Sequence, residues 1–159
     1  MAVSQVSEKD VDDLLKISDL EAVGTASWKC SSNKSWYRAE VEVQSGKVSV
    51  NLKIVITVNM YEPTIYSFAL IYNNAFRIRG LDINGSHSNK HTNSEKWIAT
   101  THKHKWTNEC RDRFAYTPND ITAEDIGGRL EQFCGECNIQ YGATLNELPP
   151  IQGTFFDEV

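Results

Sequence analysis

The chain has 159 residues, of which 40% are hydrophobic and 23% are charged, a balance typical of one globular domain. Its net charge of −5 and sequence pI near 5.4 argue against a general nucleic-acid-coating protein, because such proteins are usually basic. No apolar run approaches the roughly 20 residues of a membrane-spanning helix, and the first ten residues lack the features of a secretion signal. We therefore expect a single domain over residues 1–159, a cytosolic location without a membrane partner, and reduced thiols at the four cysteines.

A short amphipathic helix is predicted after Ser7. Ser7 suits the N-cap position, and Asp10 stands three residues later in an acidic variant of the capping box. Val11, Leu14 and Leu15 then recur at helical spacing, so one face of this helix is expected to be buried.

Four strands are predicted in the next part of the chain, over residues 36–44, 48–60, 65–72 and 75–79. The first two alternate strictly between apolar and polar residues. The third is apolar on both faces, which predicts a central strand covered on both sides. In the fourth, Arg77 and Arg79 are expected on the same side of the strand.

Residues 80–95 are predicted to form a loop, and residues 97–106 to form a fifth strand. Because side chains alternate along a strand, His102, His104 and Trp106 are expected on one face. Lys103 and Lys105 are expected on the other face.

A second helix is predicted after a loop at residues 107–120, with Thr122 as its N-cap and Asp125 at the third helical position. Its apolar stripe includes Leu130 and Phe133. Short connections between successive strands favour antiparallel pairing. The sequence thus predicts an α+β fold, a twisted antiparallel meander of about five strands with both helices packed on one face.

All four histidines of the chain lie within one short stretch, and they are His87, His91, His102 and His104. A metal site would need three or four converging ligands. His102 and His104, followed by Glu109, match part of the first cupin motif, but the matching glycines and a second histidine motif are missing. We therefore predict no metal and no other cofactor, and a zinc site on the histidines stays open as an alternative.

A metal-free site is the leading hypothesis, because imidazoles titrate near neutral pH and one ring can accept a proton while another donates. His87, His102 and His104 are the predicted catalytic residues of this site. Its predicted ligand-binding residues are Arg77, Arg79 and Trp106. The expected ligand bears phosphate, as a nucleotide or RNA does, and the expected reaction is that of a metal-independent phosphodiesterase or ribonuclease.

The second half of the chain resembles a known family. The stretch "SFALIYNNAFRIRGLDINGSH", an H-x-H-x-aromatic strand, "RDRFAY" and a helix ending in "CNI" resemble an uncharacterised family of small bacterial and mobile-element proteins, a domain of unknown function. The resemblance covers about residues 65–139. The residues that match are Arg79-Gly80-Leu81-Asp82, His87, His102, His104, Asp112 and Asn138. The resemblance implies one domain and brings no activity with it.

A non-catalytic role of the histidines is the alternative, and it has two forms. A polar strand face with His, Thr and Trp can simply contact a loop of the same protein. It can also bind a protein partner, and an acidic chain of mobile-element type would then be a non-catalytic inhibitor or regulator of a host or defence protein. Whether the protein is an enzyme is not decided by the sequence.

Overall fold

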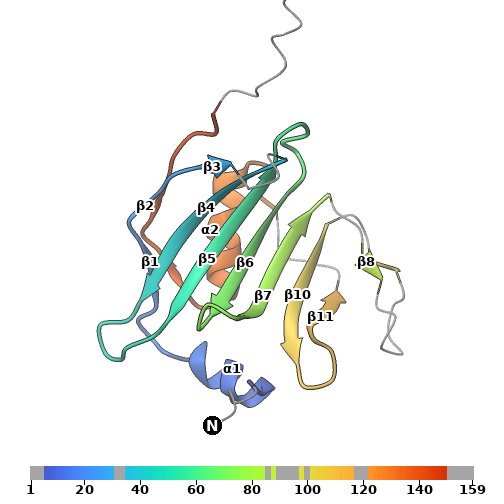
Figure 1. The fold of residues 1–159 in the computed structure, drawn as a ribbon. Helices are drawn as coiled ribbons and strands as arrows, with labels where there is room; N and C mark the ends of the chain where they lie inside the picture. Colours follow the sequence, from blue (N-terminus) through green and yellow to red (C-terminus); the bar gives the residue numbers. More distant parts are fainter. Residues whose placement is uncertain are drawn as a thin grey trace, which may run out of the picture.

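The structure is a computed structural model that describes residues 6–30, 35–84, 87–88, 97–98, 101–116 and 122–149, with no side-chain description for 87–88, 97–98 and 113. Figure 1 shows the two helices and the strands. In chain order the elements are α1 (Glu8–Leu14), β1 (Glu21–Val23), β2 (Thr25–Ala26), β3 (Lys29–Cys30), β4 (Trp36–Gln44), β5 (Leu52–Asn59), β6 (Tyr66–Tyr72), β7 (Phe76–Ile83), β8 (His87–Ser88), β9 (Trp97–Ile98), β10 (His102–Thr107), β11 (Arg111–Tyr116), α2 (Ile126–Glu136), β12 (Gln140–Tyr141) and β13 (Thr144–Leu145).

The fold is α+β, as predicted, but its main sheet has nine strands instead of about five. The strand order is β11-β10-β7-β6-β5-β4-β1-β12, and β3 also pairs with β4. All neighbours in this sheet are antiparallel except β1 and β12, which run parallel. The strands missed by the sequence analysis are mostly two or three residues long, too short for a pattern of alternation to be recognised.

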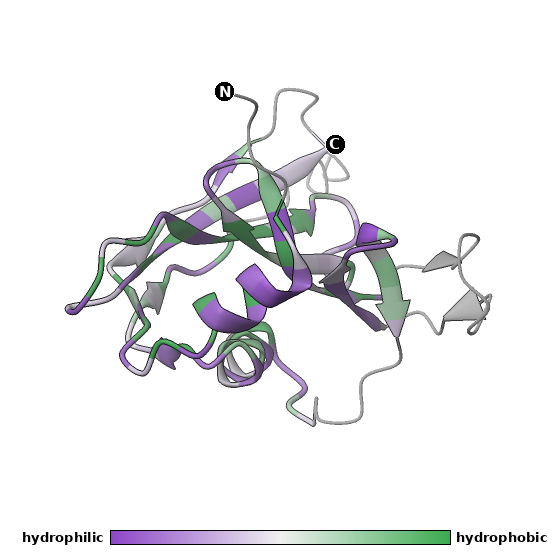
Figure 2. Ribbon diagram, turned by 90° about the horizontal axis from the view of Figure 1, so that it is seen from below, coloured by the Kyte–Doolittle hydropathy of each residue, from purple (hydrophilic) through white to green (hydrophobic). Residues whose placement is uncertain are grey.

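Helix α2 covers one face of the sheet, and Phe133 of this helix packs against Phe68 of β6 with ring centroids 5.8 Å apart. Figure 2, viewed from below, shows α2 on one side of the sheet. Helix α1 lies at one end of the strands, where it contacts β10. The two helices cover different parts of the sheet, and the expected packing of both on one face is not confirmed. In the described part of the chain, the opposite face of β4, β5, β6 and β7 carries no helix.

Alternation of apolar and polar residues determines which side chains are buried against α2. In β4 the pattern is strict, and Tyr37, Ala39, Val41 and Val43 are all buried between exposed neighbours. In β6 the alternate residues on the face without a helix are only partly buried. Strand β6 is central in the sheet, as predicted, whereas the expected cover on its second face is not confirmed by the described part of the chain.

The ends of the helices follow from their caps. In α1, Ser7 accepts a hydrogen bond from the backbone of Asp10, and the Asp10 side chain accepts one in return, so the predicted capping box is confirmed. In α2 the N-cap is Asp125 and not Thr122, because the Asp125 carboxylate accepts from the backbone N–H of Gly128. Neither described helix is long and apolar enough to cross a membrane.

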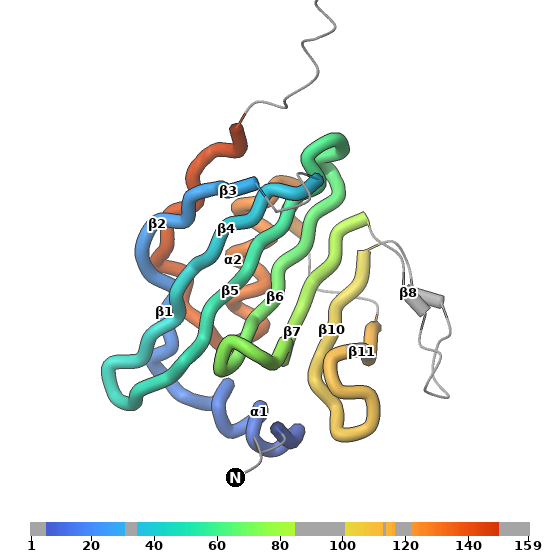
Figure 3. The backbone as a smooth tube through the Cα atoms, viewed as in Figure 1, coloured from blue at the N-terminus to red at the C-terminus, as the bar shows by residue number. Residues whose placement is uncertain are grey.

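The histidine region is arranged differently from the prediction. Strand β7 continues to Ile83, into the expected loop, and β10 begins only at His102. Figure 3 shows the chain passing from β10 through a tight turn into β11, inside the segment expected to be a loop. The resulting β7-β10-β11 arrangement positions the candidate site.

Candidate functional site on the sheet face opposite helix α2

The two histidines of β10 point to the same face of the sheet, as predicted. His102 lies directly opposite Asp82 of β7, and His104 lies opposite Gly80. Lys103, between them, lies opposite the core residue Leu81 and so points to the face that α2 covers.

A carboxylate joins the two imidazoles. The Nε2 atoms of His102 and His104 each lie 3.0 Å from the same oxygen, Oδ2 of Asp82. The two ring centroids are 4.9 Å apart, with an angle of 70° between the planes. One ligand atom from each of the three residues lies within 4.8 Å of the others. The strand pairing alone produces this cluster, which we call the Asp82 cluster.

The Asp82 cluster is buried, and its carboxylate is its most accessible part. His102 is 1% exposed and His104 is 2% exposed, whereas the side chain of Asp82 is 26% exposed. Burial raises the pKa of Asp82, but the contacts with His102 and His104 outweigh burial and hold the pKa well below its usual range. Asp82 is therefore an anion at neutral pH.

Asp82 was not named as a site residue from the sequence, although it belongs to the Arg79-Gly80-Leu81-Asp82 stretch of the family resemblance. The predicted strand ended at residue 79, and this placed Asp82 in a loop. Extending the alternation through Leu81 and Ile83, both buried, would have placed Asp82 on the face opposite the core.

A row of directly paired polar residues leads away from the Asp82 cluster across the sheet face opposite α2. Each residue of the row lies opposite the next one on the neighbouring strand. The row consists of His102, Asp82, Ser67, Thr57, Arg38 and Lys29. Ser67 and Thr57 share a hydrogen bond of 2.8 Å.

The two arginines of β7 point to opposite faces, which corrects the prediction that they share a side. A register shift in the β6–β7 pairing places Arg77 opposite Ile71 and Arg79 opposite Leu70. Because Leu70 and Ile71 are adjacent along β6, their paired arginines point apart. The extra residue of this bulge is Ile78, which is buried in the core. The alternation of apolar and polar residues in the sequence does not reveal that Ile78 is an extra residue.

Arg77 lies on the same face as the Asp82 cluster. A Cβ atom built at Gly80 would lie 3.4 Å from Cβ of His104 and 3.6 Å from Cδ of Arg77. The guanidinium donates to the backbone carbonyl of Asp112 at 2.9 Å, and its Nε lies 3.5 Å from Oδ2 of the same residue. Arg77 is thus positioned beside His104 by a residue of β11.

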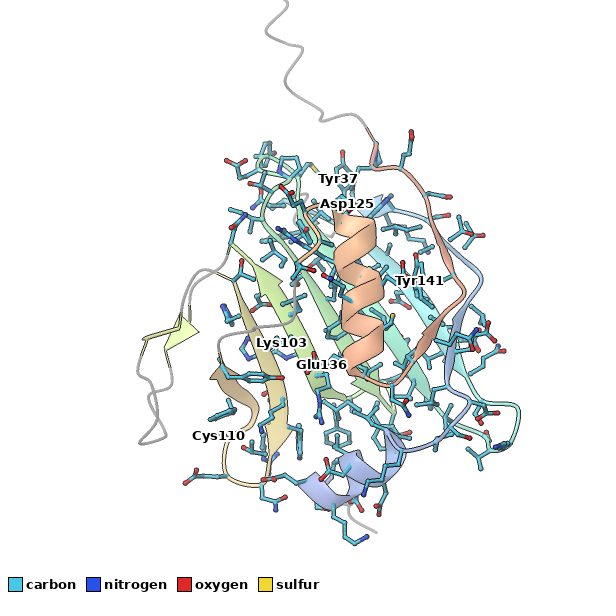
Figure 4. All side chains as sticks on the ribbon, turned by 180° about the vertical axis from the view of Figure 1, so that it is seen from behind. Tyr37, Lys103, Cys110, Asp125, Glu136 and Tyr141 are labelled. Carbon is cyan, nitrogen blue, oxygen red and sulfur yellow. The ribbon has the colours of Figure 1, made fainter. Side chains whose placement is uncertain are left out.

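A second polar cluster lies on the opposite face of the same strand. Lys103 Nζ lies 2.9 Å from Oε1 of Glu136, at the last residue of α2, and the hydroxyl of Tyr116 donates to Oε2 of Glu136 at 2.8 Å. Figure 4 shows Lys103 and Glu136 together beneath the end of α2. Burial, reinforced by the Glu136 carboxylate, raises the pKa of Tyr116 above its usual range. These three residues are called the Lys103 cluster below.

The remaining predicted site residues are Trp106 and His87, and neither adds a described side chain to the Asp82 cluster. Trp106 is buried, packs edge-on against Phe76 and donates its indole N–H to the carbonyl of Val6 at 2.7 Å. His87 begins β8, but its side chain is not among those described, and His91 lies outside the described residues. Convergence of His87 with the two β10 histidines therefore stays a prediction.

The cysteines lie apart from the Asp82 cluster. Cys110, Cys134 and Cys137 are buried free thiols, and Cys30 is an exposed one. Burial raises the pKa of Cys134 to about 12, which keeps this thiol protonated. Cys134 and Cys137 are members of the hydrophobic core.

Comparison with known proteins identifies the family of the chain. A family model described as a family of unknown function (DUF6978) matches residues 6–139. This finding confirms the expected resemblance to an uncharacterised family and extends it to the first half of the chain. No curated protein and no solved structure gives a significant match.

Proposed function

The chain belongs to the DUF6978 family, from which no activity can be carried over, and we propose that its sheet face opposite α2 binds a phosphate-bearing ligand of the nucleotide or RNA class and hydrolyses a phosphodiester bond. The observation that carries the proposal is the convergence of His102 and His104 on one carboxylate oxygen of Asp82. Rigid neighbouring strands hold these groups, and such preorganisation is what catalysis at a polar centre requires.

Arg77 supports a phosphate-bearing ligand. Guanidinium groups match the geometry of phosphate oxygens and can bind them in a bidentate manner. Its contacts with Asp112 fix the side chain beside His104, and 27% of that side chain is exposed. A ligand that approaches the accessible carboxylate of Asp82 would meet Arg77 on the same face.

The polar row supports an extended ligand over a mononucleotide. Neighbouring strands lie about 4.8 Å apart, so the four steps from His102 on β10 to Arg38 on β4 span about 19 Å. Arg38 and Lys29, at the far end of this row, line one pocket, in which Glu40 is ion-paired with Arg38 at 2.8 Å. A chain of several nucleotides could contact both this end of the row and the Asp82 cluster.

The proposal is tested with a fluorescently labelled single-stranded RNA and with a panel of nucleotides. Binding is measured by fluorescence anisotropy, and cleavage by gel electrophoresis, in buffers with Zn²⁺, with Mn²⁺ or with a chelator. We expect His104→Gln to abolish cleavage, and Arg77→Gln to weaken binding by about tenfold, the equivalent of one charge-assisted hydrogen bond of about 1.4 kcal/mol. Glu42→Gln is the matched control, because Glu42 is exposed on β4 away from the cluster.

Two results would reject the proposed function. If the wild type neither binds nor cleaves any member of the panel, or if His104→Gln cleaves like the wild type, the proposal fails. The non-catalytic interaction protein expected as the alternative would then replace it. Cleavage that persists in the chelator would support the metal-free reaction expected from the sequence.

A further inference from the structure

We propose that Asp82, His102 and His104 bind one divalent transition-metal ion. The two imidazole nitrogens and the carboxylate oxygen come from adjacent strands and point toward one another. Two histidines and one carboxylate are an established ligand set for such ions, and they leave coordination positions open for water and substrate. Neither the family match nor the sequence analysis assigns a metal to these residues.

The distances fit shared coordination. Bonds from zinc to histidine nitrogen and carboxylate oxygen are about 2.0–2.2 Å long, so two ligand atoms of one ion lie roughly 3 Å apart. Both Nε2 atoms lie 3.0 Å from Oδ2 of Asp82. All three ligand atoms lie within 4.8 Å of one another, so an ion between them requires rotation of the imidazole side chains but no change in the strand register.

The carboxylates around the Asp82 cluster favour a cation. The arginine beside the cluster, Arg77, already lies near the carboxylate of Asp112, with Nε 3.5 Å from Oδ2. A phosphate group that approaches Arg77 would therefore also meet the carboxylates of Asp112 and Asp82. A divalent ion reverses the sign of the local charge, so the inference rests in this respect on the phosphate-binding function proposed above.

Burial of the rings also favours an ion over direct contact between the histidines and a phosphate. His102 and His104 have almost no accessible surface, so only a small ligand placed among the three side chains can reach their nitrogens. The partly exposed Asp82 gives such an ion a route from solvent and leaves its open positions accessible from that side.

The ligand set indicates which ions fit. Imidazole suits Zn²⁺ and Fe²⁺, and mixed nitrogen and oxygen sites accept Mn²⁺, whereas Mg²⁺ and Ca²⁺ prefer oxygen ligands alone. In the proposed hydrolysis, the oxygen of a metal-bound water forms a bond to phosphorus and the bond from phosphorus to the leaving oxygen breaks. The proton released by the water passes to the leaving oxygen, and no atom is oxidised or reduced.

Metal binding is tested by titrating chelator-treated full-length protein with Zn²⁺, Mn²⁺ and Mg²⁺ in a calorimeter. We expect one Zn²⁺ ion per chain, weaker binding of Mn²⁺ and no detectable binding of Mg²⁺. Asp82→Asn and His104→Gln should each weaken Zn²⁺ binding by at least about a hundredfold, because loss of a direct ligand exceeds the 10–100-fold effect of an outer partner. Glu42→Gln, the matched carboxylate-to-amide control, should bind like the wild type.

A second measurement uses the wild type alone and does not depend on the folding of a variant. X-ray absorption of the Zn²⁺-loaded protein should show nitrogen and oxygen neighbours at about 2.0–2.2 Å, with scattering from two imidazole rings and no sulfur at about 2.3 Å. Absence of Zn²⁺ binding, a sulfur neighbour, or unchanged affinity in folded Asp82→Asn protein would overturn the inference.

Failure of the metal site and failure of the proposed function give different results. Chelator-resistant cleavage of RNA by a protein that binds no Zn²⁺ would reject the metal and leave the phosphodiesterase function standing. A protein that binds Zn²⁺ through the Asp82 cluster but neither binds nor cleaves the nucleotide panel would retain the metal and lose that function.

Discussion

Strand β10 carries a polar cluster on each face, and the two clusters are built differently. In the Lys103 cluster, a cation, an anion and a hydroxyl contact one another, so the charges balance. In the Asp82 cluster, one carboxylate oxygen lies between two imidazole nitrogens, and no lysine or arginine is paired with it in the described part of the chain. Both clusters are buried to a similar degree at β10, since Lys103 is 3% exposed and the histidines are 1–2% exposed.

This difference indicates a structural role for the Lys103 cluster and a ligand-binding role for the Asp82 cluster. Charge balance and mutual contacts suit the Lys103 cluster to fixing α2 against the β10–β11 hairpin. The Asp82 cluster presents two nitrogens and one carboxylate oxygen to a common point. Variants on the two faces of β10 should therefore affect different measurements.

Lys103→Met should lower the free energy of unfolding by about 3 kcal/mol, because it leaves the Glu136 carboxylate without its cation under α2. The double variant Lys103→Met/Glu136→Gln should recover most of this loss. Urea denaturation measures the effect. Zn²⁺ affinity of the folded single variant should stay within about twofold of the wild type, and a large drop would mean that the two faces are not independent.

Ionisable groups buried between α2 and the sheet should make the protein less stable at alkaline pH. Burial raises the pKa of Cys134 to about 12, whereas an unfolded thiol has a pKa of about 8.5. The unfolded chain loses this proton first, so the stabilising contribution is complete below about pH 8.5 and declines as pH rises toward 12. We expect the free energy of unfolding to fall by about 2 kcal/mol from this group between pH 8 and pH 10.

The control for this pH dependence is Cys134→Ala. Because this substitution also leaves a cavity, the slope of the free energy of unfolding against pH is compared with that of the wild type, and not its absolute value. The stability of the variant should decline less steeply over the same pH range. Equal slopes would show that Cys134 does not retain its proton in the folded state. Tyr116 and Cys137, whose pKa values burial also raises, should maintain a residual slope in the variant.

Gly80→Val should weaken Zn²⁺ binding by about tenfold, or about 1.4 kcal/mol. A Cβ at position 80 already lies 3.4 Å from Cβ of His104, so the valine methyl groups must displace that side chain. Gly80→Ala is the control and should bind nearly as the wild type does. Wild-type affinity in the valine variant would argue that the position of His104 is not critical.

Ser7→Ala should have the smallest effect, a loss of about 1 kcal/mol in the free energy of unfolding, because it removes the N-cap hydrogen bond of α1. Zn²⁺ affinity should not change. This variant shows whether modest destabilisation alone weakens metal binding, and a parallel loss of affinity would undermine the interpretation of every variant in the Asp82 cluster.

Local patterns in the sequence were sufficient to place several elements. Strict alternation placed β4 correctly at residues 36–44, and it predicted that His102 and His104 share a face opposite Lys103. The capping box identified the start of α1, because Ser7 and Asp10 contact each other within one helical turn. These features depend on residues a few positions apart, so spacing is enough to find them.

Contacts between distant residues depend instead on how the strands pair in three dimensions. Asp82 joins the histidines because β7 pairs with β10 across about twenty residues, and no spacing rule specifies that register. A bulge at Ile78 separates Arg77 from Arg79, since one extra residue reverses the side on which each following side chain lies. The histidines were visible in the sequence, whereas the carboxylate that turns them into a candidate metal site is supplied by the pairing of strands.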